Sequence, residues 1–349
     1  MRRIPPGVLE GALLADGSAA PAARLLATDE RPIGIGAATD TLLVTLEWDP
    51  PGSGPGRLVA KLPSADEVAA RTAASLGLCE REARFYADLG PRTGVNLPYC
   101  YGSVDVGAAA PAVLLADLSA SHRPIDQLSE VPLPVVRAAL AELAALQSCA
   151  WQDETAARLP WLHRRLGVPI PAIHERMQRS WAAVRDDLTA GFDARERDVV
   201  DRFVPAADAW ARSLDGPFSL VHHDFRVDNM LLAAGRPVVL DWQTVGWGAP
   251  MFDVAYLLTT SLEPATRRAV EAAEVTAHLD ALAARGVQWD REEAWTAYRR
   301  AAFAVLLMLV PAAGSVKQDS RTRTMLRRLV RHGARAVLDL DALELLPEA

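Results

Sequence analysis

The chain has 349 residues, half of them apolar, so it is long enough for two domains or one large bilobal domain with a packed core. Its formal net charge of −7 and the lack of any basic run argue against nucleic acid as the partner. The cysteines are widely spaced and odd in number, which fits reduced thiols in a cytoplasmic protein rather than a disulfide framework or a Cys-x-x-Cys zinc site: Cys79, Cys100 and Cys149.

The N-terminal third begins with a predicted helix. Residues 1–30 are rich in Ala and Leu. Met1-Arg2-Arg3 leads into Ile-Pro-Pro rather than into a continuous apolar stretch, so we expect no signal peptide. Small residues at 33–39 predict a turn, and 41–48 predicts a strand.

A loop rich in Pro and Gly then leads to a second predicted strand at 57–62, which completes a hairpin. Ser64-Ala65-Asp66-Glu67 fits a capping box that opens a helix ending near Gly90. Further strands are expected at 99–106 and 112–115.

After residue 120, helical spacing of apolar residues dominates, at 135–144, 181–210, 251–285 and 292–310. Short predicted strands interrupt the helices near 219–222, 230–233 and 237–240. The longest apolar run, 301–313, is shorter than a bilayer requires and contains a proline, so we expect a buried helix and no membrane partner.

These elements predict an α+β fold with two parts. A small antiparallel-sheet lobe occupies 1–117 and ends in a connector at 114–118. A larger, mainly helical lobe occupies 118–349. The most chemically informative residues lie among the short strands of the second part.

A phosphoryl-transfer pattern lies in the stretch that runs from His222 to Asn229 and in the apolar run that ends at Asp241. Asp224 can orient a hydroxyl or accept its proton, as a catalytic base does. Asn229 and Asp241 offer hard oxygen ligands of the kind that Mg²⁺ prefers. A solvated turn is the alternative for the loop alone, because Asp and Asn favour turns. The second carboxylate, at the end of a strand, favours the functional interpretation.

His222-His223-Asp224 also allows a metal-hydrolase interpretation. We disfavour it because adjacent residues of an extended segment point to opposite faces and no HExxH motif is present. One histidine is better placed to support the loop through hydrogen bonds. Asp253, at the start of an apolar helix, is either a helix cap or a group that bonds the backbone of the catalytic loop.

Lys61 stands out because only two of the 37 basic residues are lysines. It lies mid-strand among apolar residues, where it could hold the α- and β-phosphates of a nucleotide, or it could be an edge lysine facing solvent. A phosphate-binding lysine needs an anion to fix it. Glu82 on the following helix is the candidate, with Glu80 as the alternative.

Gly34 and Gly36 form a Gly-x-Gly pair before a strand, which suits a flap over phosphates better than a Rossmann turn. The third glycine of a full motif is missing, and no P-loop motif occurs in the sequence.

The chain resembles the aminoglycoside phosphotransferase/choline kinase superfamily, and it is closest to the branch with ecdysteroid-kinase-like proteins. The resemblance rests on a set of segments: the glycine pair, the Lys61 strand, the Glu82 helix, the connector, the Asp224 loop and the Asp241 and Asp253 segments. The resemblance implies a protein-kinase-like bilobal fold and transfer of the γ-phosphate of ATP or GTP, with Mg²⁺, to a hydroxyl of a small molecule. It also implies that the connector, with Leu115 and Asp117, holds the purine through backbone groups.

Two positions depart from the family pattern. His223 stands where the family usually has a glycine, so the loop must either adopt an ordinary backbone conformation or tolerate strain. Gln147 stands where a supporting histidine is common. Neither change removes the base or a metal ligand, so we expect an active enzyme.

Only eleven residues, 242–252, separate Asp241 from Asp253. Protein kinases use this interval for a long activation loop that supports peptide binding. We therefore expect a constitutively competent small-molecule kinase. A pseudokinase that only binds nucleotide is the rival hypothesis.

The acceptor is not fixed by the sequence. An antibiotic such as an aminoglycoside or a nucleoside (a resistance-type modification), a sugar and a sterol-like alcohol are all open, as is the oligomeric state. The net negative charge slightly favours a cationic acceptor. Residues in the segment 150–190 could line the acceptor pocket or belong to the core: Trp151, Trp161, His163, Arg164, Arg165 and Trp181.

Overall fold

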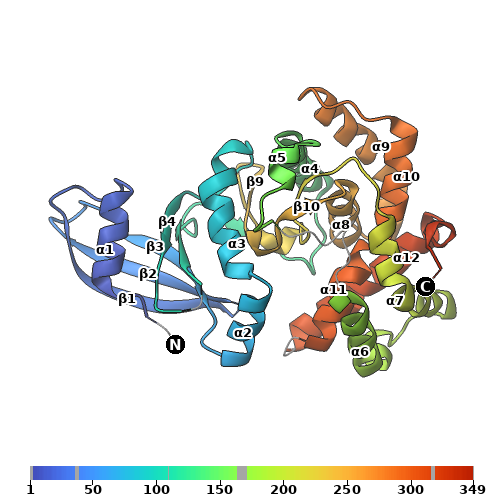
Figure 1. Cartoon of the computed structure of the whole chain (residues 1–349), viewed down its shortest axis with the longest axis horizontal. Coiled ribbons are helices and arrows are strands. Elements are labelled where there is room, and N and C mark those ends of the chain that lie inside the picture. Colours follow the sequence, from blue (N-terminus) through green and yellow to red (C-terminus); the bar gives the residue numbers. More distant parts are fainter. Residues whose placement is uncertain (1–2, 36–38, 109, 163–170, 316–318, 349) are drawn as a thin grey trace. The chain divides into compact units, whose positions relative to one another are not determined.

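The structure is a computed structural model, which describes residues 3–35, 39–108, 110–162, 171–315 and 319–348. The chain divides into two compact units (Figure 1). The first contains Met1–Arg123 together with Val238–Val245, and the second contains Pro124–Pro237 and Gly246–Ala349. A late segment of the sequence therefore belongs to the N-terminal unit.

The first unit is built on a five-stranded antiparallel sheet with the strand order β1-β2-β3-β5-β4. Its strands are β1 (Arg24–Ile35), β2 (Thr39–Asp49), β3 (Arg57–Pro63), β4 (Cys100–Val104) and β5 (Ala112–Ala116). Strands β2 to β5 lie where the sequence predicts strands. β3 is the central strand, and in its register Lys61 lies opposite Thr41 on β2 and Val113 on β5.

β1 was not predicted, because the sequence favoured a helix and then a turn over this stretch. The helix is real but short, since α1 covers only Pro6–Ala15. β1 is an edge strand, and none of its residues with assigned burial is buried; Leu26 and Ile33 are both largely exposed. A strand with no buried face lacks the apolar alternation on which strand prediction depends.

The sheet buries one face against α1. Leu9 and Leu13 of α1 pack with alternate residues of the central strands, including Leu42, Leu58 and Leu62. Because successive strand residues point to opposite faces, the position of Lys61 between buried Ala60 and Leu62 directs its side chain to the other face.

The predicted helix after β3 is divided in two. Asp66, not Ser64, caps α2 (Glu67–Ser75), accepting hydrogen bonds from the backbone N–H groups of Val68 and Ala69. Gly77 adopts a left-handed conformation with φ of 64° and separates α2 from α3 (Leu78–Arg84). α3 continues into a π-helical turn at Phe85–Leu89.

The second unit is mainly helical (Figure 1). Its helices are α4 (Leu133–Ser148), α5 (Glu154–Ala157), α6 (Pro171–Leu188), α7 (Ala194–Ser213), α8 (Met251–Ser261), α9 (Pro264–Ala283), α10 (Arg291–Arg300), α11 (Ala304–Ser315) and α12 (Ser320–Asp339). Every residue of α8 is buried, so this helix forms the centre of the unit.

Short strands interrupt the helices, as predicted. β7 (Ser219–Val221) pairs with β10 (Gly246–Gly248), and β8 (Met230–Ala233) lies between β6 (Arg123–Pro124) and β9 (Arg236–Val239). The residues between β7 and β8 form the loop that contains Asp224.

The long apolar run forms a core helix, as expected. The stretch Arg291–Gly314 is long and apolar enough to cross a bilayer by length and composition, but most of it is buried inside the protein. Near it, Phe203 of α7 stacks on Phe303, with ring centroids 5.0 Å apart, and meets Trp210 edge to face. This packing fits the core of a globular unit.

Candidate active site

Lys61 lies within hydrogen-bonding distance of two carboxylates of the first unit. Its Nζ atom donates to Oε1 of Glu82 over 2.7 Å and to Oδ1 of Asp241 over 2.8 Å. Glu82 is buried, whereas Glu80 is exposed, so Glu82 is the partner that fixes the lysine. The structure thus brings together three predicted site residues that lie far apart in the sequence.

Electrostatics keep this lysine charged. Burial alone would lower the pKa of Lys61, but the carboxylates of Asp241 and Glu82 outweigh burial and hold that pKa above its ordinary value. Only 12% of the Lys61 side chain is exposed. A buried ammonium shared by two carboxylates is a costly arrangement, which indicates a functional role rather than a solvent-facing edge residue.

Helix α3 holds the Asp241 segment in place. The backbone N–H of Trp242 donates to Oε1 of Glu82 over 3.1 Å, and the Trp242 ring stacks on Phe85 with centroids 3.8 Å apart. Arg81 adds a hydrogen bond from Nη1 to the carbonyl of Gln243, at 2.7 Å. Asp241 itself has a left-handed backbone, with φ of 66°. Such a conformation persists only where its surroundings fix it.

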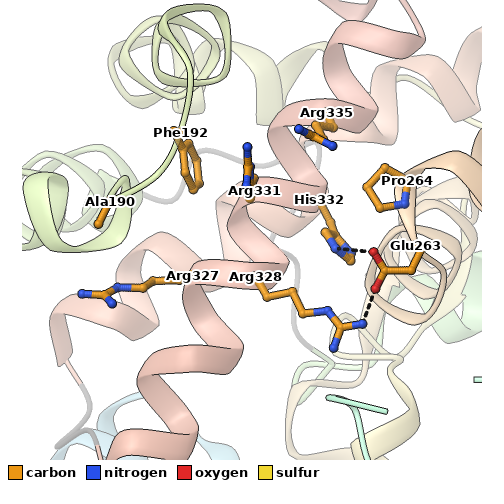
Figure 2. A pocket seen from close by; sticks show the side chains of 9 residues that line it. All are labelled: Ala190, Phe192, Glu263, Pro264, Arg327, Arg328, Arg331, His332 and Arg335. Carbon is orange, nitrogen blue, oxygen red and sulfur yellow. Dashed lines mark hydrogen bonds and ion pairs between the residues drawn. The ribbon is translucent and has the colours of Figure 1, made fainter. Parts of the chain in front are cut away.

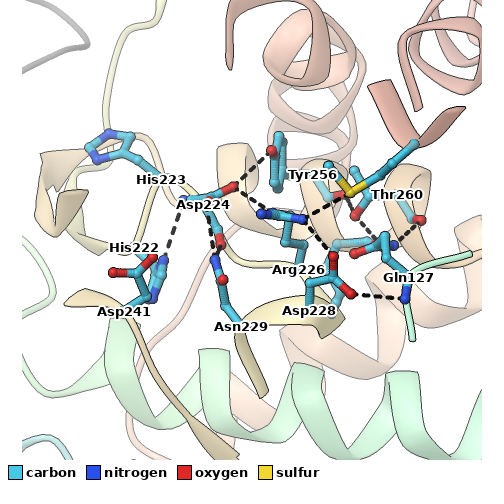
Figure 3. Close-up of polar contacts among 12 residues, drawn as sticks. Gln127, His222, His223, Asp224, Arg226, Asp228, Asn229, Asp241, Tyr256 and Thr260 are labelled. Carbon is cyan, nitrogen blue, oxygen red and sulfur yellow. Dashed lines mark hydrogen bonds and ion pairs between the residues drawn. The ribbon is translucent and has the colours of Figure 1, made fainter. Parts of the chain in front are cut away.

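In the second unit, the carboxylate of Asp224 is held on both oxygens (Figure 3). Tyr256 donates its hydroxyl to Oδ1 over 2.9 Å, and Nε of Arg226 lies 3.2 Å from the same atom. Asn229 donates from Nδ2 to Oδ2 and to the backbone carbonyl of Asp224, each over 2.9 Å. Three donors therefore fix the orientation of the carboxylate before any substrate is bound.

Asn229 also keeps an oxygen for a cation. Its Nδ2 group makes both of the contacts to Asp224, so Oδ1 is the atom that can accept a hydrogen bond or bind a metal. Asp241 offers a carboxylate, whose Oδ2 accepts from Nε2 of Gln243 over 3.0 Å. Carboxylate and amide oxygens fit Mg²⁺ chemically.

Asp253 bonds the backbone of the loop that contains Asp224, as one of its two interpretations predicted. Its Oδ2 accepts from the N–H of His222 over 2.6 Å, and its Oδ1 accepts from the N–H of His223 over 2.9 Å. It makes no side-chain cap for its own helix. Burial raises the pKa of Asp253 to about 7, even though the two backbone hydrogen bonds oppose this rise.

The backbone at His223, where the family usually has a glycine, is strained rather than ordinary. Its φ is 65°, so the loop keeps a left-handed conformation that glycine adopts freely and histidine adopts at a cost. The imidazole is fully buried and meets Phe252 edge to face, with centroids 5.3 Å apart. Packing of the ring thus offsets the strain of the backbone.

His222 supports the loop, because its Nδ1 accepts a hydrogen bond of 3.3 Å from the backbone N–H of Asp224. Among the residues that the structure describes, no group of three or more His, Cys, Asp or Glu side chains is arranged to hold a metal ion.

Gln147 is supported by a histidine from elsewhere in the sequence. Its Nε2 donates to the carbonyl of Pro250 over 2.9 Å, and its Oε1 lies 2.9 Å from Nε2 of His278 on α9. All the side chains involved are buried, and burial lowers the pKa of His278 to about 4, so its imidazole is neutral. Sequence reasoning missed His278, since nothing along the chain links it to Gln147.

The remaining predicted nucleotide residues lie in or beside the sheet of the first unit. Gly34 is on β1 opposite Thr41, at an irregularity in the register, and Gly36 lies outside the described residues. Leu115 is buried on β5. Asp117 follows β5 and forms an ion pair of 2.9 Å with Arg57.

The six residues proposed for an acceptor pocket differ in their surroundings, and three of them lie outside the described residues. Trp181 is buried and donates from Nε1 to Asp201 over 2.9 Å, which fits a core residue. Trp151 meets the ring of Trp289 at 5.3 Å between centroids, and Trp161 is half-buried. The other three lie outside the described residues: His163, Arg164 and Arg165.

Residues 29–295, most of the chain, match the model of the phosphotransferase enzyme family. The chain belongs to this family. The prediction of a member of this phosphotransferase superfamily is confirmed, as is that of a kinase-like fold. No curated protein matches the sequence.

Three solved structures illustrate the fold that this family member shares. A putative aminoglycoside phosphotransferase from Ralstonia eutropha JMP134 is 16% identical, with a TM-score of 0.59 over 99% of this chain and 100% of that one. The GDP complex of aminoglycoside 2'-phosphotransferase-IIIa is also 16% identical, with a TM-score of 0.56 over 95% and 99%. A choline kinase from Cryptosporidium parvum Iowa II is 10% identical, with a TM-score of 0.55 over 92% of each chain.

Proposed function

We propose that this protein is a nucleotide-dependent kinase that transfers the γ-phosphate of ATP or GTP to a hydroxyl group of a small molecule. The observation that carries the proposal is the buried ammonium of Lys61 between Glu82 and Asp241. A structural ion pair needs one carboxylate, whereas a lysine held between two is suited to exchange one of them for a phosphate.

Asp224 is the proposed base. Its carboxylate orients the acceptor hydroxyl and takes its proton while the hydroxyl oxygen bonds to the γ-phosphorus. The bond from that phosphorus to the bridging oxygen then breaks, and the nucleoside diphosphate leaves with the bonding electrons. Tyr256, Arg226 and Asn229 position the carboxylate through the contacts described above.

Lys61 would bind the nucleotide phosphates, with Glu82 as the group that orients it. Asp241 and Asn229 would hold Mg²⁺, which supplies positive charge to the phosphates when it is bound. The connector with Leu115 and Asp117 would bind the purine through backbone groups, and the glycine pair at Gly34 would cover the phosphates. These roles follow from the family pattern together with the positions of the side chains.

We also propose that no activation loop controls the enzyme. The eleven residues between Asp241 and Asp253 contain a 3₁₀ turn at Trp242–Thr244, the paired strand β10 and the start of α8. Ordered elements leave little chain for a segment that phosphorylation would rearrange. A phosphorylation required for activity within this interval would refute this part of the proposal.

The proposed acceptor is a small hydroxylated compound, and an aminoglycoside or another hydroxylated amine is the first class to test. The similar structures named above include an aminoglycoside phosphotransferase and a choline kinase, whose names denote such acceptors. The net negative charge of the chain also slightly favours a cationic acceptor. Sugars, nucleoside antibiotics and sterol-like alcohols complete the panel.

The experiment is a two-stage assay on the full chain. Thermal shift with Mg-ATP and Mg-GTP measures binding, and nucleotide turnover with the acceptor panel, followed by mass spectrometry for an added phosphate, measures transfer. We expect Asp224→Asn to lower kcat by about a thousandfold while nucleotide binding persists. Nucleotide binding without transfer to any acceptor would favour the pseudokinase, and unchanged turnover in Asp224→Asn would refute the assignment of the base.

A further inference from the structure

A pocket of about 300 Å³ in the second unit is lined by four arginines of one helix (Figure 2). Arg327, Arg328, Arg331 and Arg335 follow one another at helical spacing on α12, so their side chains share one side of the helix. Like charges at this spacing repel one another. In a chain with a net charge of −7, such a concentration of positive charge calls for a physical reason.

Nearby carboxylates neutralise the two N-terminal arginines of this group. Arg327 forms an ion pair with Asp187 and also donates from Nε to the backbone carbonyl of that residue over 2.8 Å. Arg328 forms an ion pair with Glu263 and donates from Nη1 to the carbonyl of Leu128 over 2.5 Å. These two side chains are accounted for by structural contacts.

Arg331 and Arg335, in contrast, share a single carboxylate. Nε of Arg331 lies 3.0 Å from both oxygens of Glu196, and Nε of Arg335 lies 2.5 Å from Oε1. Glu196 is buried and also accepts the backbone N–H of Asp193 over 2.9 Å. One carboxylate therefore contacts both guanidinium groups, while the carboxylates of Asp193 and Asp339 act on Arg335 from further away.

The terminal amino groups of these two arginines remain available. All the hydrogen bonds of Arg331 and Arg335 to described residues run through Nε, so the Nη1 and Nη2 atoms of both have no partner in this part of the chain. A guanidinium fork that keeps its outer N–H donors matches the oxygens of a phosphate group. Two such forks side by side provide the donors for one dianion.

The walls of the pocket add two further features (Figure 2). The ring of Phe192 lies on one side, 6.0 Å from the guanidinium carbon of Arg331, and Pro264 supplies a second apolar surface. His332 lines the other side with only 7% of its surface exposed; its Nε2 lies 3.7 Å from Oε2 of Glu263, and its Nδ1 atom has no hydrogen-bond partner among the described residues. An unpaired buried ring nitrogen is a group that a ligand can satisfy.

We propose that this pocket binds a phosphate-bearing small molecule, with Arg331 and Arg335 as the main ligands of the phosphate group and Phe192 and Pro264 in contact with its organic part. The pocket is built entirely from residues of the second unit and includes none of the residues assigned to phosphoryl transfer. It is therefore a separate anion site whose existence does not depend on the proposed function.

The binding test uses full-length protein with ¹³C-labelled histidine and follows the His332 ring by NMR, with His332→Gln to assign its signals. Inorganic phosphate and phenyl phosphate are titrated at constant ionic strength, with chloride as the matched control. We expect saturable shifts for both phosphates and tighter binding of phenyl phosphate, because only it has a ring to pack against Phe192. Burial lowers the pKa of His332 to about 4; Glu263 and the nearby backbone of Thr259 raise it, and Arg328 and Arg267 lower it further. A bound dianion should raise this pKa.

Variants test whether the observed phosphate binding takes place in this pocket. Arg331→Gln with Arg335→Gln should weaken phosphate binding by about tenfold or more, because charge-assisted hydrogen bonds are lost. Arg331→Lys with Arg335→Lys keeps the charges that Glu196 needs and should bind with intermediate affinity, which guards against a folding defect. Arg202→Gln, at an exposed ion pair with Asp198 on α7, is the matched control and should change nothing.

Lys61→Met separates the pocket from the nucleotide site. Binding that survives this change but is lost in the arginine variants supports the proposal. The absence of a saturable shift, equal affinity in the glutamine variants, or loss of phosphate binding in Lys61→Met would each overturn it. None of these results depends on whether the protein transfers phosphate to an acceptor.

Discussion

Tyr256 donates its hydroxyl hydrogen to Oδ1 of Asp224 over 2.9 Å, and it does so from a helix that is buried along its whole length. Asp253 lies one helical turn earlier on α8 and accepts the backbone N–H groups of His222 and His223. A single buried helix thus fixes both the backbone of the loop that contains Asp224 and the Asp224 carboxylate.

Tyr256→Phe should lower kcat by about tenfold without changing the KM for nucleotide, because it removes one hydrogen bond to the proposed base and nothing from the nucleotide contacts. Steady-state kinetics with each substrate varied in turn would measure the effect. Tyr298→Phe is the matched control, since its buried hydroxyl bonds Glu271, at 2.9 Å, and not the loop. An equal loss of kcat in both variants would show that the effect is only structural.

Lys61→Met should weaken nucleotide binding by about tenfold or more and destabilise the protein by about 3 kcal/mol, because it leaves Glu82 and Asp241 without their shared cation. Adding Glu82→Gln removes one of the two carboxylate charges that Lys61→Met leaves without a cation. The double variant should therefore regain stability in urea denaturation but not nucleotide affinity. If affinity returned along with stability, the role of Lys61 would be structural.

His223→Gly should be more stable than His223→Ala, although glycine is usually the less stable of the two residues in a folded backbone. Both changes remove a buried imidazole that packs against Phe252 and should destabilise the protein. At a φ of 65°, however, only glycine relieves the backbone strain. We expect the Gly variant to be about 1 kcal/mol more stable than the Ala variant, as measured by urea denaturation. Equal stability would mean that the left-handed backbone costs histidine nothing.

The pH dependence of stability should include a contribution from Asp253. Its folded-state pKa is raised to about 7 from an ordinary value of 3.8, so the folded protein binds a proton more tightly than the unfolded chain between these values. This contribution makes stability fall as the pH rises from about 4 to about 7. Asp253→Asn should remove that contribution, in addition to any constant loss from the altered hydrogen bonds.

Urea denaturation at pH 5 and pH 7.5 would measure this difference. Asp201→Asn is the control: hydrogen bonding to Arg185 holds the pKa of Asp201 below its ordinary value, so its contribution is lost only at a pH below about 4. The slope between the two pH values should therefore change in Asp253→Asn and stay the same in Asp201→Asn. An unchanged slope in both would contradict the raised pKa of Asp253.

Much of the site could be predicted because its residues are tied to local patterns. Lys61 interrupts an apolar strand, and Asp224, Asn229 and Asp241 have a characteristic order and spacing. Tyr256 follows Asp253 by three residues on an apolar helix, so a shared face was foreseeable, but a buried tyrosine is common enough to attract no attention. The pairing of Gln147 with His278 depends on tertiary packing alone.

Two parts of the fold escaped prediction, for different reasons. β1 exposes its side chains and gains its place from hydrogen bonds to β2, which leave no hydropathy signal. Gly77 divides a helix that residue spacing alone would continue, because its left-handed backbone ends one segment and begins the next. The Gly77 break is thus a local signal that the spacing of apolar residues concealed, whereas the position of β1 depends on its pairing with another strand.

The discontinuity of the first unit has a consequence for biosynthesis. The sheet and α3 leave the ribosome well before Val238–Val245. The contacts of Glu82 and Phe85 with Trp242 can therefore form only after about half of the second unit has been synthesised. A fragment ending at Arg123 would therefore lack the contacts of Glu82 and Phe85 with Trp242. Its Lys61 would have one carboxylate partner instead of two. The N-terminal unit is accordingly not a module that can be excised by a single cut, and its folding has to be completed after translation of the loop that contains Asp224.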